Sequence, residues 1–313
     1  MKIGFIGLGK MGMQMTRRLQ SAGFEVVATD PNADALEEAH SYGITAVPTR
    51  DEMVSLLPAP AVIWLMIPAH VVRAELELLV PLLAPESIVV DGGNSDFRDT
   101  QQNAVLCREH NVTLMDVGTS GGVHGLAHGF SMMIGGDEMA YPHIEPLIEA
   151  LAQPHGYHYF GPSGSGHYVK MVHNAIEYGV METYAEGYRL LKESSDYPAL
   201  DLAAVASVWQ HGSIISSNLN GMTAEVLRAN PTLDQVEGIV AHSGEADWAL
   251  QVAQKLNIPL PAVQVAVDAR LASSKGQITF GTKLQAALRT AFGGHPLNPA
   301  PDDARSPESG AAA

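Results

Sequence analysis

Apolar residues in the first half of the chain form short continuous runs, separated by segments with helical spacing. The runs predict strands at residues 3–6, 25–29, 61–67, 87–90, 113–117, 131–134 and 157–160. Helical spacing lies between most of these runs, as at residues 11–22, 33–41 and 71–83. Nearly continuous apolar strands that alternate with helices indicate a parallel sheet covered by helices.

After Gly161-Pro162-Ser163-Gly164 the pattern changes to helical periods alone. These predict helices at residues 165–193, 201–211, 218–229, 244–256, 261–274 and 282–292. The Gly/Pro/Ser cluster therefore marks a domain boundary. The chain divides into an α/β domain at 1–162, an all-helical domain at 163–295, and a tail at 296–313 whose Pro, Ala, Asp and Ser content predicts disorder.

The first long helix of the second domain carries a polar stripe. Lys170, His173, Asn174, Glu177 and Tyr178 fall at i, i+3, i+4, i+7 and i+8, which is one face of a helix. Apolar neighbours occupy the other faces: Val169, Met171, Val172, Ile176 and Val180. We therefore expect an enclosed helix whose buried polar groups need partners, and a substrate would supply them. A solvated helix face is the alternative.

A glycine-rich turn follows the first predicted strand and opens the first helix. Its residues are Gly7, Leu8, Gly9, Lys10, Met11 and Gly12. In a G-x-G-x-x-G turn the glycines permit a tight bend and close approach to a pyrophosphate, which the helix N-terminus attracts. Asp30 ends the second strand, where an acid binds ribose hydroxyls and repels a 2′-phosphate. These features predict a Rossmann-like, doubly wound sheet that binds NAD rather than NADP; alternatively, Asp30 only caps the turn into residues 33–41.

Two further turns follow predicted strands, at the edge where such sheets bind ligands. One contains Ser120, Gly121 and Gly122, whose hydroxyl and amides suit a carboxylate, and the other contains Asn94. Each is alternatively a flexible turn. His124 and His128 lie near the first of these without a cluster of cysteines or carboxylates, so no metal site is predicted.

Composition excludes several classes of protein. The 313 residues carry 18 basic and 34 acidic side chains, a formal charge of −16, which argues against nucleic acid or an anionic membrane as partner. One cysteine, Cys107, rules out an internal disulfide framework and fits a reducing compartment. No apolar run has the length of a membrane span, and the N-terminus lacks the apolar core of a signal peptide. A cytoplasmic protein is predicted.

Taken together, these motifs resemble the 6-phosphogluconate dehydrogenase family, in its short, NAD-preferring bacterial branch. The resemblance runs from residue 1 to about residue 298 and rests on five segments, at 7–12, 91–95, 119–122, 167–179 and 287–295. The His-Asn-x-x-Glu continuation at 173–177 separates it from the related β-hydroxyacid dehydrogenases, which share the fold and the lysine.

The resemblance implies oxidative decarboxylation of 6-phosphogluconate to ribulose 5-phosphate and carbon dioxide, without a metal. Lys170 would be the general base, which requires a lowered lysine pKa, and Glu177 would protonate the enediol. The positions that match the family's contacts to the substrate carboxylate and hydroxyls are Asn94, Ser120, Gly121, Gly122, His173 and Asn174, with Tyr178 beside them and Asn94 also facing the cofactor. Arg270, Arg289 and His295 match phosphate-binding positions, the last two usually donated by the partner of a homodimer or homotetramer.

One segment departs from the family pattern. Ala246 and Asp247 precede Trp248 where the family usually has glycine and a basic residue. An acid near a phosphate would weaken binding or change the ligand, so a related sugar acid or an unusual hydride acceptor stays open. Two further alternatives are a non-decarboxylating β-hydroxyacid dehydrogenase or imine reductase on the same scaffold, and a non-catalytic dinucleotide-binding regulator.

Overall fold

The computed structural model describes residues 1–242 and 244–294, and it divides into two compact units, Met1–Asn174 and Ala175–Ala313. The units meet inside one long helix, α8 (Ser165–Lys192), rather than at the Gly/Pro/Ser cluster. The physical reason is that the first turns of this helix pack on the sheet. The domain limits at 162 and 295 stay a prediction, and His295 and the tail lie outside the described residues.

The first unit contains an eight-stranded sheet with the order β3-β2-β1-β4-β5-β6-β7-β8. The strands are β1 (Lys2–Ile6), β2 (Glu25–Thr29), β3 (Thr45–Ala46), β4 (Val62–Leu65), β5 (Ile88–Asp91), β6 (Thr113–Ser120), β7 (Phe130–Gly135) and β8 (Ala152–Tyr159). All neighbours pair in parallel except β6 and β7. The reversal of strand order at β1 and β4 is the switch point of a doubly wound fold, so the predicted fold class is confirmed.

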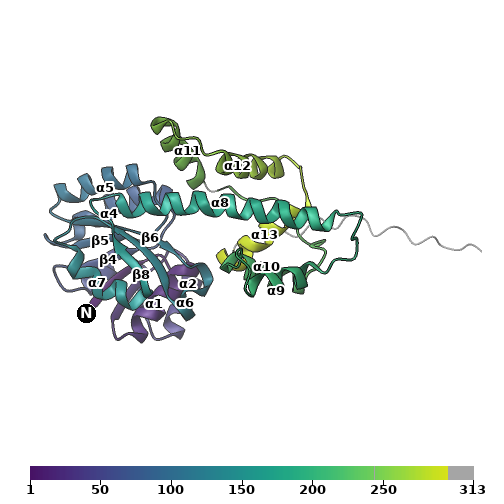
Figure 1. Ribbon diagram of the computed structural model, residues 1–313. Coiled ribbons are helices and arrows are strands. Elements are labelled where there is room, and N and C mark those ends of the chain that lie inside the picture. The colour runs from purple at the N-terminus through teal and green to yellow at the C-terminus, as the bar shows by residue number, and fades with distance from the viewer. Residues whose placement is uncertain (243, 295–313) are drawn as a thin grey trace, which may run out of the picture. The chain divides into compact units, whose positions relative to one another are not determined.

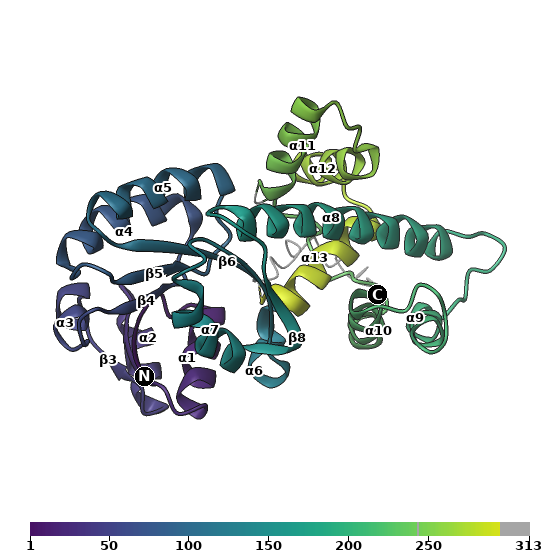
Figure 2. The same ribbon diagram turned by 60° about the vertical axis from the view of Figure 1, so that its left-hand side comes forward.

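Helices cover both faces of this sheet (Figure 2). One face packs on α1 (Lys10–Ser21), α2 (Ala33–Ser41) and α7 (Tyr141–Leu151), the other on α3 (Arg50–Ser55), α4 (Ala69–Leu79) and α5 (Phe97–Glu109). Because both faces are buried, strand residues such as Ile3, Ile63 and Val89 are fully buried, which explains their continuous apolar runs.

One pair of strands departs from the parallel arrangement. β6 and β7 are antiparallel, since only the short turns η2 (Gly122–His124) and α6 (Gly125–His128) connect them, too little chain for a parallel crossover. β6 also continues through Ser120, beyond the predicted end at residue 117. Ser120 is therefore the last residue of a strand rather than part of a flexible turn.

The second unit is helical, as predicted. It comprises most of α8 with α9 (Leu202–Gln210), α10 (Asn218–Ala229), α11 (Glu245–Leu256), α12 (Pro261–Ser274) and α13 (Phe280–Gly293). Figure 1 shows α9 and α10 on one side of α8, and α11 and α12 on the other. The core forms where α8, α9, α10 and α13 meet, around Met181, Tyr188, Leu227 and Leu288.

Two observations bear on the protein's class. Among the described residues, none of the helices is both long and apolar enough to cross a membrane. Cys107 lies fully buried on α5, and burial raises the pKa of its thiol to about 12, so it is not a reactive nucleophile.

Glycines let the start of α8 approach the sheet closely. A Cβ atom on Gly118 of β6 would collide with the Cβ of Lys170, and one on Gly166 of α8 would collide with the Met133 carbonyl of β7. A Cβ on Gly135 would lie 2.6 Å from the Gly166 amide nitrogen. The carboxylate of Asp116 accepts hydrogen bonds from the Gly164 and His167 amides, at 2.8 and 3.0 Å, and so holds the first helical turn. Lys170 therefore has a position fixed by backbone contact.

We expect Gly118→Ala to displace Lys170, because the new methyl group has no space beside the lysine stem. Overpacking of this kind costs about 1–3 kcal/mol, so the free energy of unfolding should fall by that amount and activity should fall with it. Gly187→Ala is the matched control. Gly187 lies on α8, the helix of Lys170, and a Cβ there meets nothing within 4 Å. The variant should be neutral or stabilise by up to about 1 kcal/mol. Denaturant titrations and kinetics of the two variants make the comparison, and equal effects would contradict it.

Candidate active site

The amine of Lys170 is the centre of a buried polar cluster in the first unit. The residue is 6% exposed, and its Nζ donates to Asn174 Oδ1 at 2.8 Å and lies 3.4 Å from His173 Nδ1. His173 and Asn174 also contact each other, at 3.1 Å. The i, i+3, i+4 spacing on α8 therefore brings the predicted base and two hydrogen-bonding groups together, as helix geometry requires.

Two strand ends complete this cluster. Ser120 Oγ at the end of β6 lies 3.3 Å from His173 Nε2, and Asn94, just after β5, accepts from Asn174 Nδ2 at 3.4 Å. Strands β5 and β6 are parallel neighbours, so their carboxyl ends meet at one edge of the sheet. Gly121 has φ of +129°, which turns the chain sharply beyond Ser120. The structure thus brings together Asn94, Ser120, Lys170, His173 and Asn174, which the sequence predicted from three separate segments.

The other faces of α8 differ from the prediction of an enclosed helix. The polar residues Lys170 and Asn174 are buried, whereas Val172, Ile176 and Val180 are 39%, 61% and 37% exposed. These three residues form a stripe at i, i+4 and i+8. The face that carries Lys170 packs on the sheet instead, because glycines of β6 and β7 have no side chains that would keep the helix away. The apolar stripe needs another explanation.

In the second unit, α8 continues with Glu177 and Tyr178. Tyr178 is 4% exposed, and the guanidinium carbon of Arg270 lies 3.3 Å from the centre of its ring. Burial lowers the pKa of Arg270 to about 10; Tyr178, Glu177 and Glu245 act to raise it, and Arg289 to lower it further. Arg270 therefore stays charged at neutral pH while it is almost completely shielded from water.

Arg289 lies beside Arg270. Nη1 of each arginine approaches the carbonyl oxygen of Ala241, that of Arg270 at 3.5 Å. Arg289 is 9% exposed and Arg270 2%. Two of the three predicted phosphate-binding residues thus lie together within one chain, while the third, His295, lies outside the described residues.

The glycine-rich turn has the predicted conformation. Gly7 has φ of +100°, and a Cβ on Gly12 would collide with the Gly7 carbonyl, so α1 begins directly against the turn. A Cβ on Gly9 meets nothing within 4 Å, so open space lies above the backbone where a pyrophosphate would approach. The residues present therefore fit a dinucleotide.

Asp30 contacts the same turn. Its carboxylate accepts from the Leu8 amide at 2.6 Å and from the Asn32 amide at 2.8 Å. Asn32 caps α2 itself by accepting from the Asp34 amide, while Asp30 caps the turn that leads into this helix. Each carboxylate oxygen has a second lone pair, which leaves room for a ribose hydroxyl.

A cavity of about 470 Å³ lies beside this turn. Its lining comprises Leu8, Gly9, Lys10, Met13, Gln14, Arg17, Asn32, Asp34, Ala35, Glu38, Val123 and Leu126. Sequence reasoning missed Arg17, whose guanidinium carbon lies 3.8 Å from the centre of the Tyr42 ring. Helical spacing from Lys10 was the signal that could have found it, since residues seven apart share a helix face. The cavity thus contains an arginine, whereas the residues directly after Asp30, Pro31 and Asn32, are not basic.

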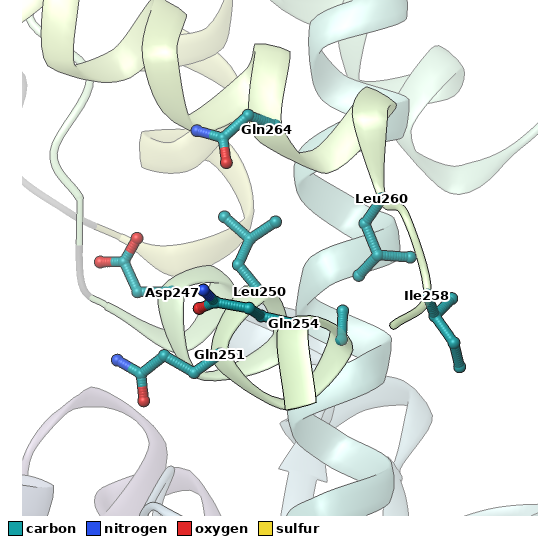
Figure 3. A pocket seen from close by; sticks show the side chains of 8 residues that line it. Asp247, Leu250, Gln251, Gln254, Ile258, Leu260 and Gln264 are labelled. Carbon is teal, nitrogen blue, oxygen red and sulfur yellow. The ribbon is translucent and has the colours of Figure 1, made fainter. Parts of the chain in front are cut away.

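A second cavity, of about 620 Å³, lies between α11 and α12 in the second unit (Figure 3). It is lined by Asp247, Leu250, Gln251, Ala253, Gln254, Ile258, Leu260 and Gln264, without a basic side chain or a predicted catalytic residue. In the described part of the chain, no group of three or more His, Cys, Asp or Glu residues is arranged to hold a metal ion.

Comparison with known proteins agrees with this arrangement. Residues 2–162 match the NAD binding domain of 6-phosphogluconate dehydrogenase, and residues 166–296 match the 6-phosphogluconate dehydrogenase C-terminal domain. A Haloferax volcanii protein named 6-phosphogluconate dehydrogenase, NAD(+)-dependent, decarboxylating, is 39% identical over 298 residues, which cover 94% of this chain and 98% of that protein.

Longer relatives match as well. A Bacillus subtilis protein named 6-phosphogluconate dehydrogenase, NADP(+)-dependent, decarboxylating, is 33% identical, with 87% of this chain and 61% of that protein covered. The solved structure of Plasmodium falciparum 6-phosphogluconate dehydrogenase has a TM-score of 0.79 at 29% identity, and covers 93% of this chain and 65% of that one.

We expect Asp30→Ala to narrow or reverse a preference for NAD over NADP. The change removes hydrogen-bond acceptors for the ribose and the repulsion of a 2′-phosphate, while Arg17 remains in the cavity. Loss of a charged hydrogen bond should raise the Michaelis constant for NAD about 10- to 100-fold. Steady-state kinetics with both cofactors measure the effect.

Asp30→Asn separates the two causes, because the amide oxygen still accepts a hydrogen bond but carries no charge. It should improve the use of NADP with a smaller loss for NAD. A wild-type preference for NADP would contradict the assignment of Asp30.

Proposed function

This chain belongs to the 6-phosphogluconate dehydrogenase family, and on that premise we propose how its residues oxidise and decarboxylate 6-phosphogluconate to ribulose 5-phosphate and carbon dioxide. The observation that carries the assignment of roles is the buried Lys170 amine, held by Asn174 and His173 at the carboxyl edge of the sheet. We further propose that the enzyme prefers NAD. We also propose that it works in the cytoplasm, where reducing conditions suit the free, buried Cys107 thiol.

Lys170 is the general base for the oxidation. It removes the proton from the C3 hydroxyl of the substrate, and a bound nicotinamide would accept the hydride from C3. Burial disfavours the charged ammonium relative to the neutral amine that accepts a proton. The Asn174 oxygen at 2.8 Å fixes the direction of the amine, so the side chain needs no reorganisation when substrate binds.

Decarboxylation then follows from the product of the first step. The C3 carbonyl accepts the electron pair released when carbon dioxide leaves, and Lys170, now protonated, stabilises that oxygen. Glu177 protonates the enediol carbon that carried the carboxylate, which becomes C1 of ribulose 5-phosphate. Lys170 and Glu177 lie two turns apart on α8, roughly 10 Å along its axis, which matches opposite ends of a short sugar acid.

Neutral hydrogen-bonding groups position the rest of the substrate. Asn94, Ser120, His173 and Asn174 contact one another around the Lys170 amine and bind hydroxyl and carboxylate groups when the substrate is present. The amides of Gly121 and Gly122 bind the carboxylate. Arg270 and Arg289 bind the phosphate, and Tyr178 packs against Arg270.

The nucleotide binds at the turn formed by Gly7, Gly9 and Gly12, with its adenosine part in the adjacent 470 Å³ cavity. Lys10 and Arg17 supply positive charge there, while Leu8 and Met11 complete the turn. When bound, the cofactor supplies a hydride acceptor; the protein supplies its position and the charge that selects it.

The direct test measures carbon dioxide release from 6-phosphogluconate with NAD, NADP and a deazaflavin acceptor. Lys170→Met should abolish the oxidation, and Glu177→Gln should slow mainly the decarboxylation and protonation. Loss of one general acid or base typically lowers the rate about 100- to 10,000-fold.

The 3-keto intermediate, supplied directly, bypasses the oxidation and separates the steps. Lys170→Met should then regain more of the wild-type rate of product formation than it shows with 6-phosphogluconate, whereas Glu177→Gln should stay slow at the protonation. Near-normal oxidation by a folded Lys170→Met protein would show that the base is another residue. Oxidation without carbon dioxide release would favour the non-decarboxylating alternative, and absence of turnover with every sugar acid would favour a regulator.

The minimum functional unit is a homodimer, on its own or within a homotetramer, with each active site shared. The exposed apolar stripe of Val172, Ile176 and Val180 supports this, since a neighbouring copy would remove it from water. Within one chain Arg289 contacts its own Ala241, so a role in the partner's site requires that contact to be exchanged. His295 would accompany Arg289.

Subunit mixing distinguishes the shared site from one built within a chain. We expect a hybrid of Arg289→Ala and Lys170→Met subunits to regain activity, because one of its two sites would then have both residues intact. Truncation before Arg289 should raise the Michaelis constant for 6-phosphogluconate and leave NAD binding unchanged. A hybrid of wild-type and Lys170→Met subunits is the control for subunit exchange. An active monomer, or confirmed hybrids without activity, would contradict sharing.

A further inference from the structure

His242, two residues before Gly244 in the segment that precedes α11, lies beside the two arginines. Its ring contacts Tyr178, with 6.0 Å between ring centres, on the same tyrosine that packs under Arg270. The residue before it, Ala241, provides the carbonyl that both Arg270 and Arg289 approach. Tyr178, His242, Arg270 and Arg289 therefore form one continuous group within the second unit.

Two nitrogen atoms of this group are buried without a hydrogen-bond partner. They are Nδ1 of His242 and Nε of Arg270, and Arg270 is 2% exposed. A buried donor without an acceptor is costly, and a buried guanidinium most of all. Two guanidinium groups that approach one carbonyl oxygen also repel each other. An anion with several acceptor oxygens would supply the hydrogen-bond acceptor that Nε of Arg270 lacks and would reduce this repulsion.

Asp247 determines the orientation of His242. Its Oδ2 lies 2.6 Å from Nε2 of His242, so the imidazole directs Nε2 to the acid and Nδ1 to the buried side. The Asp247 side chain is 45% exposed and lies at the rim of the 620 Å³ cavity, next to Gln251 (Figure 3). The acid that replaces a basic residue in this segment is therefore paired with a histidine.

We propose that His242, oriented by Asp247, binds an oxygen of the substrate phosphate through Nδ1, next to Arg270, and so determines specificity for a phosphorylated sugar acid. Both ring nitrogens carry protons in the imidazolium, so Nε2–H donates to the Asp247 carboxylate while Nδ1–H donates to a phosphate oxygen. The imidazolium thus adds a cation next to Arg270. This inference rests on the proposed function for the identity of the substrate.

The test compares His242→Gln with wild type on 6-phosphogluconate, on gluconate, and in calorimetric titration with inorganic phosphate. A charged hydrogen bond to phosphate corresponds to about 10- to 100-fold in affinity. The Michaelis constant for 6-phosphogluconate and the dissociation constant of phosphate should both rise by that factor. The constants for gluconate and NAD should not change. His143→Gln, an exposed histidine on α7, is the matched control.

Asp247 is a positioning residue, so its variants should affect the same constants and no others. Asp247→Asn should raise the Michaelis constant for 6-phosphogluconate about threefold to tenfold, with an unchanged turnover number, and Asp247→Glu should restore it in part. Asp234→Asn, an exposed acid of the same unit, is the control. Equal losses for gluconate and 6-phosphogluconate would mean a structural role and would overturn the inference.

Failure of the two proposals is distinguishable. A wild-type enzyme that does not release carbon dioxide from 6-phosphogluconate would refute the proposed function, and the phosphate titration would still decide the role of His242. Unchanged phosphate binding and an unchanged Michaelis constant in folded His242→Gln would overturn the role of His242 even if wild type is fully active.

Discussion

Close contact between the start of α8 and the sheet positions Lys170, the proposed general base. Gly118, Gly135 and Gly166 have no side chains, so the helix backbone lies directly against β6 and β7. Asp116 then binds two amides of the first helical turn. This contact places a lysine amine out of water at the carboxyl end of a strand, where an unanchored lysine would extend into solvent.

The same contact explains why Lys170 and Asn174 of α8 are buried, while the apolar stripe of Val172, Ile176 and Val180 is exposed. A helix normally buries its apolar stripe, but here the sheet accepts Lys170 and Asn174 because strand ends and neighbouring side chains satisfy them. One face of the helix thus carries the buried polar cluster around Lys170, and another carries the exposed apolar surface of Val172, Ile176 and Val180.

Charge is distributed to suit an anionic substrate on an acidic protein. The chain has a formal charge of −16, yet Arg270 and Arg289 lie buried side by side. Burial removes these cations from screening by water and salt, which strengthens their interaction with a phosphate. Burial also lowers the pKa of Arg270 to about 10, still well above neutrality. The two buried cations thus give an acidic chain a local positive charge.

The sequence by itself determined the fold class, seven of the eight strands, the helices of the second unit, the glycine-rich turn and the stripe on α8. These follow from local spacing: apolar runs, helical periods, and glycine where the backbone must bend. It also placed Lys170, His173 and Asn174 together, because residues three and four apart on a helix are neighbours. Only the tertiary structure showed that β7 runs antiparallel to β6, because the apolar run of a strand does not carry the direction in which it pairs. It alone brought Arg17 into the nucleotide cavity and His242 between Asp247 and Tyr178. Those contacts join residues from different elements, and no periodicity along the chain specifies which separate segments meet.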